Sequence, residues 1–170
     1  NEIVWLDLQA ILPAGALPDA AARAASNIVL LAVNGAGRIC AYDRTHDAWI
    51  PAPSNGVVNV GAWTRLTLRL DYRARLWDGY LHSRRVFQGI PFANASTRAL
   101  SSIRVSFLPA SDAPRELLGD ALRLSTNEPP DLDNDGDGLP NAWERQHGFD
   151  PEQADDATAD GDGDGLNRLQ

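Results

Sequence analysis

Short stretches of alternating apolar and polar residues recur along the first 126 residues of the chain. The clearest is Trp63–Asp71, where three leucines alternate with arginine and threonine, a period of two that predicts a strand with one buried face. Apolar, β-branched and alternating runs bounded by turn residues predict further strands over residues 3–8, 27–33, 38–42, 76–81, 85–90, 102–108 and 117–124. Residues 19–25 fit either a short helical turn or a surface loop. The pattern therefore predicts an all-β, antiparallel sandwich.

After two prolines at 129 and 130 the pattern changes to an acidic, glycine-rich stretch. Asp133, Asp135 and Asp137 occupy positions 1, 3 and 5 of the D-x-[DN]-x-[DN]-G-x5-E pattern, with Gly138 at position 6 and Glu144 at position 12. Alternate residues of a tight loop can point several carboxylates at one centre, which suits the six to eight oxygen ligands of Ca²⁺. The spacing predicts a calcium-binding loop.

The rest of the loop offers further ligands. We expect the Leu139 carbonyl to face the ion, Asn141 to bind it directly or through water, and Glu144 to close the site with two oxygens. Glu144 would lie in the first turn of a short helix predicted over residues 140–147. Asp131 is a candidate flanking or second-site ligand. The alternative is a solvated acidic linker, which gives no reason for a carboxylate at position 12.

The acidic pattern recurs near the end of the sequence. Asp160, Asp162 and Asp164 take positions 1, 3 and 5 of a second loop, and Leu166 offers its carbonyl at position 7. Position 12 would be residue 171, one beyond Gln170. We expect that the natural chain continues, that the site is open and weak, or that another chain completes it.

Charge divides the chain at the same point. Residues 131–170 hold 12 of the 23 acidic residues and 2 of the 15 arginines, and the earlier part is nearly neutral. The sequence has no basic patch with interleaved aromatic residues, so a nucleic-acid partner is not expected. It also has no apolar run of about 18 residues, so no membrane span is expected. Cys40 is the sole cysteine, so it has no internal disulfide partner and we expect a small buried apolar residue.

Two resemblances follow from these motifs. The segments DGDGLPNAWE, HGFDP and DGDGDGLNRLQ make residues 131–170 resemble the bacterial thrombospondin type 3 calcium repeats, and more loosely dockerin-type EF-hand loops. Residues 63–72, 76–81 and 86–89 make the first part resemble a laminin-G/concanavalin A-like jelly roll, although His82-Ser83 replaces the family's usual Asn-Gly turn. The resemblances imply a jelly-roll domain over 1–126 with further strands upstream and an open N-terminal edge, a linker over 127–130, and a calcium repeat over 131–170.

Catalysis and sugar binding are the alternatives to this interpretation. The sequence contains no H-E-x-x-H or G-x-S-x-G motif, and we interpret Asp43, His46 and Asp47 as an exposed loop, so we expect no enzymatic activity. Trp49, beside a proline-rich turn, is the candidate for stacking against a sugar. Trp63 and Trp77 match core positions of the jelly-roll family.

These observations predict a non-enzymatic, calcium-binding module of a secreted or cell-surface bacterial protein. In the first hypothesis calcium stiffens an acidic stalk next to a β-sandwich used for adhesion or recognition. The alternatives are a subunit of an extracellular fibre or calcium-bridged assembly, and a lectin-like domain of a larger secreted enzyme. Glycans, other surface proteins and further copies of the chain are the candidate partners besides calcium.

Overall fold

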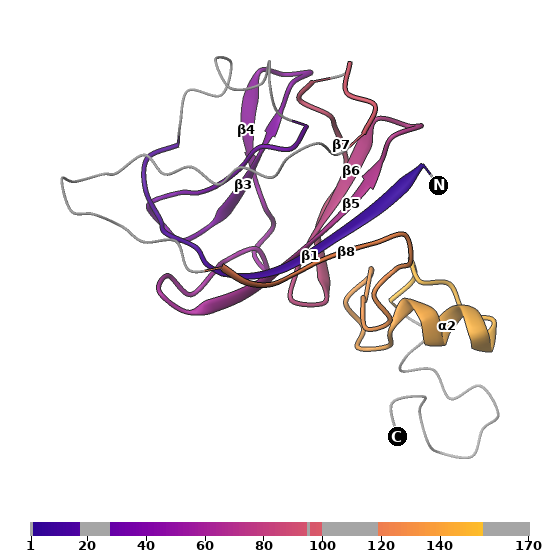
Figure 1. Cartoon of the computed structure of the whole chain (residues 1–170). Helices are drawn as coiled ribbons and strands as arrows, with labels where there is room; N and C mark the ends of the chain where they lie inside the picture. Colours follow the sequence, from indigo (N-terminus) through magenta and orange to yellow (C-terminus); the bar gives the residue numbers. More distant parts are fainter. Residues whose placement is uncertain (1, 18–27, 95, 100–118, 155–170) are drawn as a thin grey trace.

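The computed structural model describes residues 2–17, 28–94, 96–99 and 119–154, which form two antiparallel sheets (Figure 1). The strand order is β7-β6-β5-β1-β8 in the five-stranded sheet and β2-β3-β4 in the three-stranded sheet. The strands are β1 (Ile3–Ile11), β2 (Leu31–Val33), β3 (Ile39–Asp43), β4 (Ala48–Pro51), β5 (Trp63–Asp71), β6 (Leu76–Leu81), β7 (Arg84–Pro91) and β8 (Gly119–Ser125). The predicted all-β class with antiparallel pairing is confirmed in this part of the chain.

The alternation along β5 builds the hydrophobic core. Leu66, Leu68 and Leu70 line one face of the strand and are all buried. They belong to one apolar cluster with residues of both sheets, including Ile39 of β3 and Trp77 of β6. The two sheets therefore form two layers that bury their apolar faces against each other.

The predicted hairpin at residues 34–37 joins β2 to β3. The side-chain oxygen Oδ1 of Asn34 accepts hydrogen bonds from the backbone N–H groups of Ala36 and Arg38, both at 3.0 Å. Gly37 takes φ +75°, a left-handed conformation that costs glycine little. Cys40, in β3, is 1 % exposed, which confirms the prediction of a small buried residue.

The structure corrects one sequence-based prediction about strands and adds a strand that was not predicted. Strand β1 lies between β5 and β8, so the N-terminal strand is not the open edge that the family resemblance implied. The unpredicted strand is β4, which pairs antiparallel with β3, from Ala48 opposite Asp43 to Pro51 opposite Cys40. The predicted strand over 102–108 and the alternatives for 19–25 lie outside the described residues.

Two of the tryptophan predictions need correction. Trp77 is 0 % exposed, as expected, but Trp63 is 48 % exposed and is not a core residue. Trp63 is the first residue of β5 and pairs with Ile11, the last residue of β1, so it lies at the end of this strand pair. Trp49 is partly buried and packs edge-on against Tyr42, with ring centroids 6.0 Å apart, so it is not the exposed stacking platform that its turn suggested.

Replacement of the two tryptophans should separate their roles. We expect Trp77→Ala to lower the free energy of unfolding by about 3–5 kcal/mol, because the missing ring leaves a cavity in the core. Trp63→Ala should change it by only about 0.5 kcal/mol, as at other exposed positions. Urea unfolding followed by circular dichroism measures both values. Equal losses of unfolding free energy in the two variants would show that Trp63 contributes to the core as much as Trp77 does.

The first acidic loop leads into helix α2 (Asn141–His147). The helix begins one residue later than the predicted range of 140–147 and ends where predicted. Pro140 is the extended N-cap residue, and Gly148 ends the helix in a left-handed conformation with φ +79°. Trp143 stacks on the ring of His147, one turn later, with centroids 4.0 Å apart. Among the described residues, no helix has the length and apolar character needed to cross a membrane.

Candidate metal centre in the acidic loop

Three aspartates predicted as ligands come together at the start of the loop. Asp133, Asp135 and Asp137 each offer one carboxylate oxygen, and these three atoms lie within 4.8 Å of one another. Hard oxygen donors are the ligands that Ca²⁺ prefers over softer nitrogen and sulfur sites. The structure thus places positions 1, 3 and 5 of the pattern around a common point.

The loop is coiled by hydrogen bonds from its own backbone to these carboxylates. Asp133 accepts from the N–H of Gly136 at 2.6 Å through Oδ1 and from the N–H of Gly138 at 3.1 Å through Oδ2. Asp135 and Asp137 each accept from the N–H two residues further on, at 3.1 and 2.8 Å. Gly138 adopts φ +101°, a conformation that L side chains rarely reach, which explains glycine at position 6.

These bonds leave part of the negative charge uncompensated. The second carboxylate oxygens of Asp135 and Asp137 are buried and accept no hydrogen bond from the protein. Burial, and then the neighbouring charges of Asp137 and Asp133, raise the pKa of Asp135. A buried charged oxygen is costly unless a donor or a cation meets it. The residues present therefore fit a bound divalent cation with hard-ligand preference.

Helix α2 adds a buried carboxylate at position 12 of the pattern. Glu144 is 0 % exposed, and both of its carboxylate oxygens are inaccessible to solvent. It follows Asn141 by three residues, so the two side chains lie on the same side of the helix, and both are buried. Leu139, at position 7, is also buried. The side of the helix that carries Asn141 and Glu144 faces the loop, because Asn141 forms hydrogen bonds with Asn134 of the loop.

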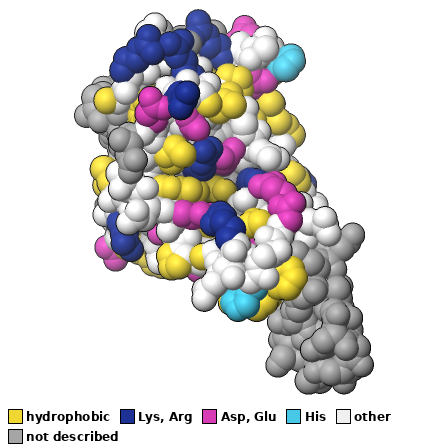
Figure 2. Space-filling model, turned by 90° about the vertical axis from the view of Figure 1, so that its right-hand side faces the viewer, with side chains coloured by type: hydrophobic (Ala, Val, Ile, Leu, Met, Phe, Trp, Pro, Cys, Tyr) yellow, Lys and Arg dark blue, Asp and Glu magenta, His cyan; other side chains and the backbone are white. Residues whose placement is uncertain are grey.

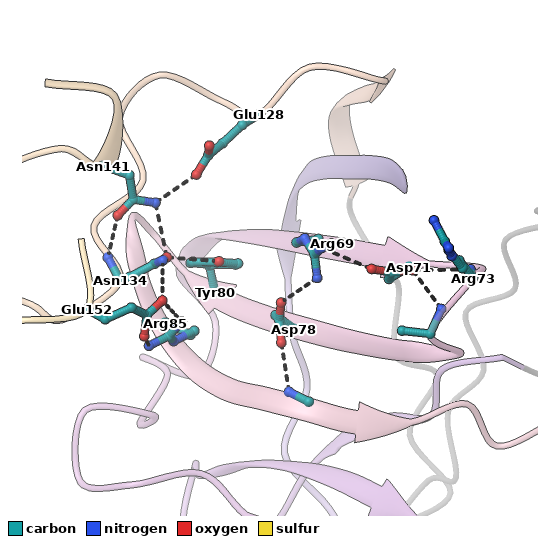
Figure 3. A network of polar contacts seen from close by, with 12 residues as sticks. Arg69, Asp71, Arg73, Asp78, Tyr80, Arg85, Glu128, Asn134, Asn141 and Glu152 are labelled. Carbon is teal, nitrogen blue, oxygen red and sulfur yellow. Dashed lines mark hydrogen bonds and ion pairs between the residues drawn. The ribbon is translucent and has the colours of Figure 1, made fainter. Parts of the chain in front are cut away.

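The structure gives Asn141 a role within the protein (Figure 3). Its side-chain oxygen accepts from the backbone N–H of Asn134 at 2.8 Å, and its Nδ2 donates to Asn134 Oδ1 at 3.0 Å and to Glu128 Oε1 at 2.7 Å. Glu128 also forms an ion pair with Arg145 of the helix. Asn141 therefore fastens the loop to the helix, and its participation as a calcium ligand stays a prediction. Glu128, in the linker predicted over 127–130, is therefore a partner of helix α2.

Asp131 does not join the three clustered aspartates. Its carboxylate forms an ion pair with the guanidinium of Arg65, on strand β5, with Nη2 3.2 Å from Oδ1. The hydrogen bond from Arg65 lowers the pKa of Asp131. The sequence offered no local signal for this partner, which lies 66 residues earlier. The second predicted loop, with its ligands Asp160, Asp162, Asp164 and Leu166, lies outside the described residues.

A polar hollow lies beside the loop, on the face of the five-stranded sheet away from the core. It has a volume of about 380 Å³, and Trp5, Arg69, Asp78 and Glu128 are among the residues that line it. Arg69 donates to Asp78 and to Asp71, both at 3.1 Å (Figure 3). Acidic and basic side chains likewise lie next to each other across the face of the molecule shown in Figure 2. The hollow thus offers paired charges of both signs.

A separate Asp–His pair holds the turn between β3 and β4. The buried carboxylate of Asp43 contacts Nδ1 of His46 at 2.5 Å and accepts from the backbone N–H of Thr45 at 2.7 Å, while Tyr42 donates to Asp47 at 2.7 Å. Burial raises the pKa of Asp43, but the hydrogen bonds from His46 and Thr45 outweigh it, so that the pKa is lowered. These contacts give the pair a structural use within the turn. The prediction of an exposed loop holds for His46 and Asp47 but is wrong for Asp43, which is buried at the end of β3.

The depressed pKa of Asp43 predicts how the turn responds to acid. The stabilisation that the ionised Asp43 carboxylate gives should be complete above about pH 4, the ordinary pKa of aspartate in an unfolded chain. It should disappear as the pH falls through the lower pKa that Asp43 has in the folded protein. The difference in unfolding free energy between the wild type and Asp43→Asn should therefore shrink from about pH 6 to about pH 3. Urea titrations across this range measure it. A constant difference would exclude the carboxylate charge as its source.

Comparisons with protein-family models, curated proteins and solved structures found no match for this chain. The resemblances to thrombospondin type 3 repeats and to laminin-G-like domains therefore stay predictions.

Proposed function

We propose that the chain is a non-enzymatic, calcium-binding module of a secreted or cell-surface protein. The observation that carries this proposal is the pair of buried, unbonded carboxylate oxygens on Asp135 and Asp137, next to the third aspartate of the group. A divalent cation would compensate the buried negative charge of these oxygens, which no hydrogen-bond donor of the protein meets. Asp133, Asp135, Asp137 and Glu144 would hold the ion, and the ion would supply charge neutralisation and cross-linking of the loop to helix α2.

Calcium fits this donor set better than the smaller magnesium ion. A complete twelve-residue pattern with a carboxylate at its last position offers more oxygens than Mg²⁺ normally takes from a protein, because Mg²⁺ keeps several of its waters. Millimolar calcium outside cells also suits loops of this kind, which often have modest affinity. This chemistry supports the extracellular setting and the resemblance of residues 131–170 to thrombospondin type 3 repeats.

The finer description of the sandwich as a laminin-G-like jelly roll belongs to the same proposal. Two packed antiparallel sheets support it, with β5, β6 and β7 as consecutive neighbours, as in the segment that carries the resemblance. In this proposal the sandwich serves adhesion or recognition, and calcium makes the acidic segment rigid where it leaves the sheet.

A second candidate function is recognition of a polar ligand such as a glycan in the hollow beside the loop. The observation that favours it is the pairing of Arg69 with both Asp71 and Asp78 in the lining of the hollow. Such a group of charges can both donate hydrogen bonds to hydroxyl groups and accept them. A glycan array probed with the calcium-loaded protein tests it, and Arg69→Ala should abolish any signal. A signal unchanged in that variant would place the ligand elsewhere.

Calorimetry on the chelator-stripped protein tests the calcium site. We expect binding of Ca²⁺ with an affinity that falls at least about tenfold in Glu144→Gln, because the variant loses a charged ligand. Asp120→Asn makes the same change of charge on the exposed strand β8 and should alter the affinity by less than about twofold.

Light scattering with and without calcium then decides between a stalk and an assembly. A constant monomer mass supports the stiffened segment, and a rise in mass with calcium supports the fibre or bridged assembly. The absence of any calcium-binding heat or ordering would overturn the proposal and leave the segment as an acidic linker.

A further inference from the structure

The entry of the acidic loop is paired with the edge of the five-stranded sheet. The backbone N–H of Asp133 donates to the carbonyl of Ser83 at 3.0 Å, and the N–H of Arg85 donates to the carbonyl of Asp133 at 3.4 Å. Asp133 and Arg84 thereby form a parallel β-bridge. Since Asp133 is position 1 of the proposed calcium loop, strand β7 fixes the backbone of the first ligand.

The residue before Asp133 anchors the same segment in an apolar site. Leu132 is 0 % exposed and packs with Trp5 of β1 and Tyr80 of β6, whose rings lie 6.1 Å apart. This cluster lies on the face of the sheet away from the core. Burial of the leucine removes its apolar surface from water and thereby stabilises the junction between sheet and loop.

Asn134, at position 2 of the loop, connects three parts of the protein (Figure 3). Its Oδ1 accepts from the hydroxyl of Tyr80 at 3.0 Å and from Asn141 of helix α2 at 3.0 Å. Its Nδ2 donates to Glu152 at 2.9 Å. A movement of the sheet relative to the loop would therefore break bonds on both sides of this one side chain.

Arg85 supports this connection from strand β7. Its guanidinium donates to both carboxylate oxygens of Glu152, at 2.8 and 2.6 Å, and its side chain is 13 % exposed. The hydrogen bond from Arg85 lowers the pKa of Glu152, which keeps that carboxylate ionised. A continuous path of contacts thus runs from Arg85 through Glu152 to Asn134, beside the loop and without using any proposed ligand.

We propose that Arg85 is a positioning residue of the calcium loop, and that docking of residues 131–134 on the sheet and calcium binding stabilise each other. The inference rests on the proposed calcium function. Docking fixes the backbone at positions 1 and 2 before the ion arrives, which lowers the conformational entropy that closure must remove. Because coupling is reciprocal, the ion must strengthen the docking by the same factor.

Calorimetric affinity for Ca²⁺ is the first test. We expect Arg85→Ala to weaken binding about tenfold, within the usual range of coupling between sites. Arg85→Lys keeps the charge but not the two-point contact, so its affinity should lie between those of the wild type and Arg85→Ala. Arg73→Ala is the matched control, because Arg73 extends from the turn between β5 and β6 and pairs with Glu2 at 3.8 Å, away from the acidic segment. It should bind calcium like the wild type.

Thermal unfolding in calcium and in EDTA is the second test. Coupling requires Arg85→Ala to lower the melting temperature more in calcium than in EDTA. Where Arg85→Ala does not fold, Glu152→Gln interrupts the same path at a half-exposed side chain and should show the same pattern.

The outcomes separate the two proposals. A wild type that binds calcium, with unchanged affinity in both Arg85→Ala and Glu152→Gln and equal losses of melting temperature in calcium and EDTA, would overturn the coupling alone. A wild type that binds no calcium would overturn the calcium function and the coupling with it.

Discussion

The position of the acidic segment depends on how its charge is compensated. The three loop aspartates hold carboxylate oxygens within 4.8 Å of one another, and a fourth carboxylate on helix α2, that of Glu144, is fully buried. Backbone N–H groups satisfy some of these oxygens and coil the loop, but N–H dipoles do not cancel whole charges. The same geometry that makes a compact loop thus gathers negative charge that the loop's own N–H groups only partly compensate.

Basic residues of the sheet compensate other carboxylates of the acidic segment, outside the three clustered aspartates. Arg65 on β5 meets Asp131, and Arg85 on β7 meets Glu152, so basic residues of a nearly neutral domain are placed where the acidic segment crosses it. Surface ion pairs alone contribute little to stability. Here they flank Leu132, which is 0 % exposed, so they orient a segment that apolar packing already holds. The two ion pairs therefore contribute more to the orientation of the acidic segment on the sheet than to the stability of the fold.

The sequence predicted local features well and long-range partners poorly. The bounds of β5, the turn at residues 34–37 and the end of α2 follow from alternation, turn residues and capping, which are properties of neighbouring residues. The clustering of the three aspartates follows from spacing within one loop. The exposure of Trp63 and the pairing of Asp131 with Arg65 depend on which strands become neighbours and where a sheet ends, and no pattern within a short window contains that information.

The outer face of β5 shows why the period-two pattern misjudged the surface. Thr67 and Arg65 occupy the polar side of the alternation, which normally faces water. In the structure Thr67 is 0 % exposed and donates to Asp7 at 2.8 Å, and Arg65 donates to the same carboxylate at 2.9 Å. A polar strand face is suited equally to solvent and to a polar partner, because both satisfy the same donors and acceptors. An arginine-rich polar face in a chain that also carries an acidic segment therefore indicates an internal docking surface as readily as an exposed one.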